Sequence, residues 1–424
     1  MRRPSLPSSA LVPFLLAATP LAAQAPRPQP ARTLVIENVS VVDVEAGTTR
    51  AGQRIVLRGD SIVAVEPSST PAPGNATRTI DGTGLFAIPG LVDHHVHLSA
   101  GMEATLERAT RGGVTMVQAL AGDNRIAGYL AVAVRSGRVK GPEIAYASVM
   151  AGPGFFTDPR FISAGAGYTP GTAPWAQAVT AETDLATAVA AARGSGAEVL
   201  KLYAMMDSAL VARLTGEAHR QGMRVVAHGT VFPARPAELV AGGVDVLSHA
   251  PYLSWQGAPT IRAEDAWDRR EGPYATVAPD GAALGAVVNA MARAGTHLEP
   301  TLWVFSRNPA DTLLQRWAAT ITRAARRAGV PILAGTDGLI DGDATALPNI
   351  HKEMALLVEA GLTPAQALAA ATTVPARLMG RGATHGLVAP GRVADLVLLE
   401  GNPLVDIANT TRIRMVIRRG EVLP

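Results

Sequence analysis

The chain has 424 residues, of which 48% are hydrophobic and 17% are charged, so it is long enough to bury a sizeable core. Its net charge of +3, without a basic stretch interleaved with aromatic residues, argues against nucleic acid or an anionic membrane surface as a partner. The absence of cysteine excludes disulfides, a lipoprotein anchor and thiolate metal ligands.

The first 25 residues are typical of a secretory signal peptide. Arg2 and Arg3 form a basic start, residues 11–18 form a short apolar stretch, and Ala23-Gln24-Ala25 fits a small-x-small cleavage site. The apolar stretch is too short to span a bilayer comfortably, so we expect cleavage near residue 25 and no membrane anchor afterwards. A disordered tail or an uncleaved anchor is the alternative. Export without cysteine fits a periplasmic or secreted bacterial protein.

Short apolar runs separated by turn residues occur near both ends of the chain. Near the N-terminus they are Leu34-Val35-Ile36, Ile55-Val56-Leu57 and Ile62-Val63-Ala64-Val65. Similar runs at 396–399, 414–418 and 421–423 close the chain. We therefore expect residues 26–85 and 386–424 to form one small β-sandwich-like domain from both ends.

Between these ends, Ala-rich helical segments alternate with short apolar strands. Such helix–strand pairs cover residues 184–203, 208–228, 236–249, 282–302 and 317–337. This α/β pattern favours a (β/α)8 TIM barrel at 86–385. An open doubly wound sheet is the alternative, but the sequence contains no Gly-rich dinucleotide-binding loop that would favour it. Residues 151–180 and 250–280 lack periodicity and are expected to form long loops over the barrel mouth, where such loops shape substrate pockets.

Polar side chains stand at or near the C-terminal ends of the expected strands, the end at which barrel active sites are built. His95 and His97 are one residue apart and should share one side of their strand, with His94 on the other. A single such histidine is more often a structural residue, but a series that ends in an aspartate favours a metal centre. The series is His95, His97, Lys201, His228, His249 and Asp337.

Three segments make nearly the whole chain resemble metal-dependent amidohydrolases, in the branch of imidazolonepropionases and Xaa-Pro or Xaa-Arg dipeptidases. They are Pro89 to His97, Asn349 to Pro364 and Gly386 to Val397. The resemblance implies two divalent metal ions, with zinc the first choice for these donors. It implies that His95, His97 and Asp337 bind the more buried ion and His228 and His249 the more exposed one, while Lys201 is carboxylated on its amine and bridges both.

The implied reaction is hydrolysis of a C–N bond in a small molecule such as a dipeptide, an N-acyl amino acid or a cyclic amide. A metal-bridging hydroxide would attack, with Asp337 as general base and then acid. Hydrolysis of a lactone, ester or organophosphate is the alternative. A mononuclear deaminase is less favoured because no glutamate follows His228 at the third position, and a non-catalytic binding protein because the whole metal set is present. Homo-oligomers occur among relatives, but no interface can be identified in the sequence.

Four further residues are candidate substrate contacts. Tyr203 and Tyr252 follow two of the metal-site residues closely, although packing within the loops is an equal alternative. Gln118 stands where dipeptidase-like relatives often carry an Arg-Asp pair. His351 belongs to the helix after the last strand, where a structural role is at least as well supported.

Overall fold

The computed structural model describes residues 32–424 except 72–73, 75, 270 and 343–344. The expected signal peptide, residues 1–25, lies outside the described residues. Within the described ranges, no helix has both the length and the apolar character needed to cross a bilayer.

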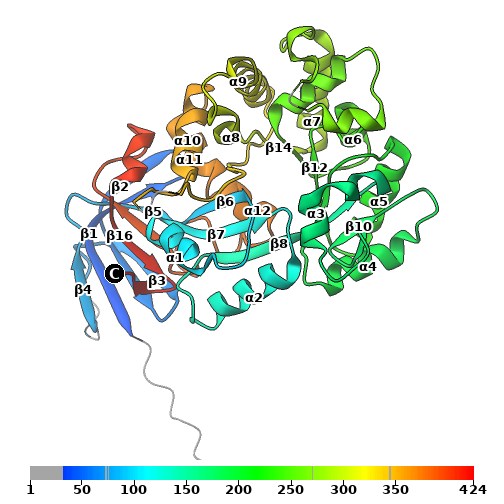
Figure 1. The fold of residues 1–424 in the computed structure, drawn as a ribbon. Helices are drawn as coiled ribbons and strands as arrows, with labels where there is room; N and C mark the ends of the chain where they lie inside the picture. The colour runs from blue at the N-terminus through cyan, green and yellow to red at the C-terminus, as the bar shows by residue number, and fades with distance from the viewer. Residues whose placement is uncertain (1–31, 72–73, 75, 270, 343–344) are drawn as a thin grey trace, which may run out of the picture.

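The first sheet combines the two ends of the chain, which lie side by side in blue and red in Figure 1. Its strand order is β17-β16-β15-β5-β1-β2-β3, with β4 beside β1. Strand β15 pairs antiparallel with β5, and Ile36, Ile55 and Leu398 contribute to a separate core. The strands are β1 Thr33–Asp43, β2 Thr48–Arg58, β3 Ser61–Pro67, β4 Arg78–Asp81, β5 Phe86–Pro89, β15 Leu396–Leu399, β16 Ile413–Arg418 and β17 Glu421–Val422.

The second sheet has nine strands, and those that carry the site are parallel in the order β6-β7-β8-β11-β12-β13-β14. These strands are almost continuously buried, as expected when both faces of a parallel sheet are covered. The α/β class is confirmed. The strands are β6 Leu91–Val96, β7 Val114–Ala119, β8 Glu143–Ala151, β9 Thr172–Ala173, β10 Ala176–Ala178, β11 Val199–Leu202, β12 Arg224–His228, β13 Val246–Ser248 and β14 His297–Glu299.

The segment 331–337 differs from the predicted strand, because only an isolated bridge between Ile332 and Leu298 forms there. The segment nevertheless bonds to both edges of the parallel sheet: Leu298 of β14 donates its N–H to the Pro331 carbonyl, and His94 of β6 donates to that of Ala334. These contacts are the ones expected if the sheet closes on itself.

Helices begin where the sequence supplies caps and bury one apolar stripe. The carboxylates of Asp184 and Asp207 accept backbone N–H groups at the starts of α4 and α5, and α5 buries Leu210, Leu214 and Ala218 on one face. The helices are α1 Glu103–Arg111, α2 Asn124–Arg135, α3 Pro159–Ala164, α4 Leu185–Gly194, α5 Ser208–Arg220, α6 Pro236–Ala241, α7 Ala282–Ala294, α8 Leu302–Ser306, α9 Thr312–Arg327, α10 Ile350–Glu359, α11 Pro364–Ala370 and α12 Thr373–Leu378.

The segments 151–180 and 250–280 contain more structure than the long loops that the sequence predicts. The first holds the 3-10 turn η1 (Pro153–Thr157), α3, β9 and β10, and the second holds η2 (Ala250–Gly257), η3 (Ala263–Trp267) and η4 (Pro273–Ala275). Elements this short show no hydrophobic periodicity, so the sequence does not predict them. Packing of aromatic side chains stabilises them here. Phe155, Phe161, Tyr203 and Trp255 belong to one buried cluster that joins both segments.

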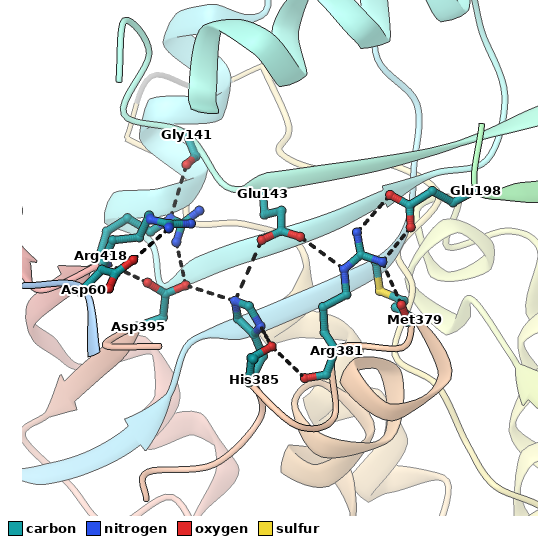
Figure 2. Close-up of polar contacts among 11 residues, drawn as sticks. Asp60, Gly141, Glu143, Glu198, Met379, Arg381, His385, Asp395 and Arg418 are labelled. Carbon is teal, nitrogen blue, oxygen red and sulfur yellow. Dashed lines mark hydrogen bonds and ion pairs between the residues drawn. The ribbon is translucent and has the colours of Figure 1, made fainter. Parts of the chain in front are cut away.

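A network of polar contacts lies between the N-terminal ends of the parallel strands and the first sheet (Figure 2), in which His385 is 3.8 Å from Glu143 and 4.0 Å from Asp395. Arg381 bonds to Glu143 at the start of β8 and to Glu198 just before β11. Arg418 of β16 forms a buried pair with Asp395 at 2.6 Å. Because both partners belong to the first sheet, this pair fixes β16 against the start of β15, and breaking it would leave an unpaired buried charge. The Nε of Arg418 also donates to the Gly141 carbonyl, just before β8, at 3.4 Å. This end of the strands is therefore structural, and the opposite end is free to carry chemistry.

Candidate metal centre

The C-terminal end of β6 places His95 and His97 side by side. Their ring centroids are 5.4 Å apart. The His95 side chain is buried, whereas His97, just beyond the strand, has 41% of its side chain exposed. The two imidazoles thus run from the interior of the sheet out to its solvent-facing end.

His94 does not point away from His95, as simple strand alternation predicts. Both rings bond to one buried carboxylate: Nδ1 of His94 lies 2.5 Å from Oε1 of Glu299, and Nδ1 of His95 lies 2.6 Å from Oε2. The pairing of β6 with β7 shifts register between Asp93 and Val96. Because such an irregularity breaks the alternation of side chains, the prediction for His94 was wrong.

Asp337 is held against both histidines of β6. Its N–H donates to the carbonyl of His95, and its Oδ1 lies 2.7 Å from Nε2 of His97 and 3.4 Å from Nε2 of His95. Its φ of +56° is a costly conformation for a residue other than glycine, which the surrounding contacts must maintain. Burial acts to raise the pKa of Asp337, but the imidazoles of His95 and His97 outweigh it and hold this pKa well below its usual range.

His228 ends β12 and His249 follows β13. Nδ1 of His228 lies 3.2 Å from the Tyr203 carbonyl, and Nδ1 of His249 lies 2.9 Å from the Thr301 hydroxyl. Because the carbonyl can only accept a hydrogen bond, Nδ1 of His228 carries the proton. Its Nε2 is then unprotonated and has a lone pair available for a metal ion. Burial lowers the pKa of both histidines well below the usual value, so both are neutral, the form that binds metals.

Lys201 of β11 lies beneath these rings and is fully buried. Its Nζ donates to the Ser248 hydroxyl at 2.8 Å, and that hydroxyl donates to Glu299 at 2.7 Å. Lys201 pairs in register with Val226, two residues before His228, and therefore shares its face of the sheet. Burial lowers the pKa of Lys201 to about 8, which leaves part of its amine neutral near neutral pH.

Glu299 is the residue that the sequence analysis missed. It accepts from His94, His95 and Ser248 and so orients one side of the site. Burial acts to raise its pKa, but His95 and His94 hold the pKa well below the usual range, so the group is ionised. Its position gives a signal, because Glu299 is the last residue of β14 just as His228 is the last residue of β12.

The donor set fits divalent metal ions. Ligand atoms of His95, His249 and Asp337 all lie within 4.8 Å of one another. The His249 ring is 5.0 Å from that of His95 and 4.9 Å from that of His228, and Asp337 joins His97 to the group. Neutral imidazoles with one oriented nitrogen and an ionised carboxylate are suited to zinc.

The four candidate substrate residues lie in different places. Tyr203 and Tyr252 line a cavity of about 390 Å³ together with the histidines and Asp337. The Tyr203 ring is 4.3 Å from that of His228, and the Tyr252 ring is 5.2 Å from that of His249. Gln118 is buried on β7 and lines a separate, much smaller space with His94. His351 is buried between the Gly112 carbonyl and the Thr410 hydroxyl, as in a structural role.

The position of His351 leads to a pH prediction. Burial lowers its pKa to about 4, so between roughly pH 6.5 and 4 the unfolded chain takes up a proton that the folded chain does not. The free energy of unfolding should fall across this window by up to about 3 kcal/mol from this group alone. In His351→Gln, the decrease measured by urea denaturation at pH 7, 5.5 and 4 should be smaller than in the wild type. Equal decreases in both proteins would contradict the prediction.

Comparison with known proteins places this site in a family. Residues 86–423 match the model of the amidohydrolase family. The chain is 25% identical to a putative prolidase from Bifidobacterium longum, with a TM-score of 0.69 over 93% of this chain and 95% of that one. It also resembles a molinate hydrolase, at 18% identity and a TM-score of 0.72 over 93% and 95% of the two chains. The latter likeness concerns the fold alone.

A shorter match links the chain to an adenine deaminase of Mesorhizobium japonicum, 35% identical over 74 residues. That match covers 18% of this chain and 12% of the relative, so it transfers no activity. The family match, in contrast, spans most of the chain. This protein belongs to the amidohydrolase family.

Glu299 should control metal affinity without touching a metal. We expect Glu299→Gln to weaken metal binding by about 10- to 100-fold, because residues that orient ligand histidines have effects of this size. Competition with a chromophoric chelator would measure the affinity. Glu143→Gln, at the other end of the strands, is the matched control and should bind metal as the wild type does. Unchanged affinity in Glu299→Gln would reduce Glu299 to a packing role.

Proposed function

We propose that this protein hydrolyses the amide bond of a small molecule, such as a dipeptide or an N-acyl amino acid, at a centre of two divalent ions. The observation that carries the proposal is the convergence of four imidazoles and the Asp337 carboxylate on one cavity, with a buried lysine beneath them. A single ion would not need so many donors, because a catalytic zinc usually takes three protein ligands.

Lys201 supports the two-ion assignment. Its amine is buried and bonds only to the Ser248 hydroxyl among the described residues, so no carboxylate compensates its charge by direct contact. A neutral amine can add to CO2 with loss of a proton, and the two carbamate oxygens would be further ligands for the ions. We propose zinc as the metal, since the donors are nitrogen and oxygen atoms, although manganese or cobalt would also accept them.

The roles of the side chains follow from their positions. Ions bound here would supply an activated water and polarise the substrate carbonyl. Asp337 is ionised throughout the working pH range and is oriented by His97, so it can accept a proton and pass it to the leaving nitrogen. Tyr203 and Tyr252 form the wall of the cavity next to His228 and His249 and restrict the access of bulk water.

The test combines metal analysis with a substrate screen. The purified, zinc-loaded protein is incubated with mixed dipeptides, N-acyl amino acids, cyclic amides and lactones, and products are identified by mass spectrometry. We expect two ions per chain and cleavage of amides. Cleavage of lactones or esters alone would move the function to ester hydrolysis, release of ammonia from an aminopurine would indicate a deaminase, and a protein that binds no metal would overturn the proposal.

We further propose that the parallel sheet is closed into a (β/α)8 barrel, and that the enzyme acts in the periplasm of a bacterium or is secreted. The contacts of residues 331–337 with β14 and β6 support closure. The basic and apolar start of the chain supports export. Expression of the full chain in a bacterium, followed by N-terminal mass analysis of the periplasmic fraction, should find a mature chain that begins near residue 26. A full-length chain retained in the cytoplasm would contradict export.

A further inference from the structure

The wall of the metal-site cavity contains a guanidinium group that forms no ion pair with any residue that the structure describes. Arg269 lines the 390 Å³ cavity with His228, His249 and Asp337. Its Nη2 donates to the Tyr203 carbonyl at 2.6 Å, but its Nε is shielded from solvent and has no hydrogen-bond partner among the described residues. Among all the residues that the structure describes, no carboxylate lies within ion-pair distance of Arg269.

The surroundings of Arg269 make this unpaired charge costly. The guanidinium carbon lies 5.5 Å from the ring centres of both Phe232 and Tyr252, so aromatic faces replace water around it. Burial lowers the pKa of Arg269, which records the cost of the charge. Aromatic contacts recover only part of the hydration lost by a cation. Arg269 as a residue is half-buried, but its Nε is shielded from solvent and unpaired, and a shielded donor on a cation is expected to find its partner in a ligand.

The backbone around Arg269 is anchored. The Tyr274 hydroxyl donates to the Arg269 carbonyl, and the Tyr274 carbonyl accepts from the indole N–H of Trp317 at 2.8 Å. Trp317 is fully buried on α9, a helix of the main core. The backbone that carries Arg269 is therefore fixed, and the bond from Nη2 to the Tyr203 carbonyl holds the guanidinium against the cavity wall, which suits a group that orients a ligand.

Arg269 also lies next to the metal ligands. The Tyr203 carbonyl accepts from both Arg269 and Nδ1 of His228, so the guanidinium and the imidazole share one acceptor. The Tyr252 ring, on which Arg269 rests, contacts His249. A substrate whose anionic group binds Arg269 could therefore place its carbonyl group over His228 and His249. Within that substrate, only a few bonds would separate the anionic group from the carbonyl.

We propose that Arg269 binds the carboxylate of the substrate, and that the substrate is an amide whose leaving amine is an α-amino acid. The inference rests on the proposed amide hydrolysis and narrows it to N-acyl amino acids and dipeptides. In these compounds, the carbon bonded to the scissile nitrogen also bears the carboxylate, which matches the proximity of Arg269 to His228. A planar guanidinium can bind both oxygens of a carboxylate, and so can select for it.

The second arginine on this cavity has a different character. Arg160 pairs with Asp158 at 2.5 Å, and 79% of its side chain is exposed. Its charge is already compensated by Asp158 and hydrated, so Arg160 needs no anionic ligand to balance it. The argument for a substrate anion therefore rests on Arg269 and not on the number of basic residues around the cavity.

The test uses pairs of substrates with the metal-loaded full chain. Each N-acetyl-L-amino acid is paired with the analogue in which hydrogen replaces the carboxylate. The wild type should cleave the acids with kcat/KM about 100-fold higher than the analogues, since truncating one partner of a buried charge pair typically has an effect of this order or larger. Arg269→Met should lose this preference while keeping its metal content, so that its kcat/KM on the acids falls to its own value on the analogues.

A control and a binding measurement complete the test. Arg262→Met removes an exposed arginine of the same loop that pairs with Asp265 outside the cavity, and it should keep the preference. Calorimetric binding of the acids should be lost in Arg269→Met alone. Equal loss of both substrate types in Arg269→Met, or equal rates of the wild type on both, would overturn the carboxylate assignment and leave amide hydrolysis intact. If no amide is cleaved, the proposed function fails, and binding of the acids still decides the role of Arg269.

Discussion

Replacing Lys201 with alanine is expected to lower kcat/KM by at least about 1,000-fold, because a metal centre contributes several kcal/mol to transition-state stabilisation. The fully buried amine lies beneath His228 and His249 and has only the Ser248 hydroxyl as a described hydrogen-bond partner. If its carbamate joins two ions, the variant should retain fewer than two metals per chain. Steady-state kinetics and elemental analysis of the same preparation would test both expectations.

The cavity left by the alanine substitution provides a further test. Formate or acetate could occupy the space of the lost carbamate and should restore part of the activity of Lys201→Ala. Lys201→Met fills this space with an apolar side chain of similar length, so small carboxylates should not rescue it. A Lys201→Ala protein that keeps two ions and full activity would show that the lysine is only a buried cation.

Replacing Asp337 with asparagine is expected to lower kcat by about 1,000-fold, within the range attributed to general acid–base catalysis. The amide keeps the shape of the carboxylate but cannot take up a proton. Since the pKa of Asp337 is held well below its usual range, the wild type should lose no activity through this group down to mildly acidic pH. Kinetics from pH 5 to 9, together with metal content, would measure the effect.

The metal content of Asp337→Asn separates two roles of the residue. A variant that keeps both ions and loses turnover would support proton transfer. A variant that loses an ion and its activity together would make Asp337 chiefly a ligand. Full activity with full metal content would contradict both roles.

The sequence allowed the strand-end residues to be predicted because each stands in a local pattern. His228 follows an apolar run that forms β12, and His249 follows β13. In a parallel sheet such ends meet at one edge, and the structure does bring these rings within 4.9 Å of each other. The helices α6 and α7 also begin at the first residues of the helix–strand pairs expected at 236–249 and 282–302.

Other features of the site depend on contacts that no local pattern records. The bond between Glu299 and His95 joins residues 204 positions apart, and the position of His94 depends on a register shift in β6. Arg269 lies in a segment of single turns whose conformation is set by Tyr274 and the core around it. Hydrophobic periodicity gives the strands and helices, but it cannot show how irregular segments fold over them.

The pairing of β5 with β15 has a consequence for the order of folding. A ribosome completes residues 86–89 long before residues 396–399, yet these segments are neighbours in one sheet. Until the last residues emerge, β5 lacks its partner and presents an open edge to other chains. Completion of this sheet therefore waits for residues 396–399, and contacts so distant in sequence make folding slow. A chain that cannot finish folding early stays longer in an extended state, which is the state that the proposed export would need.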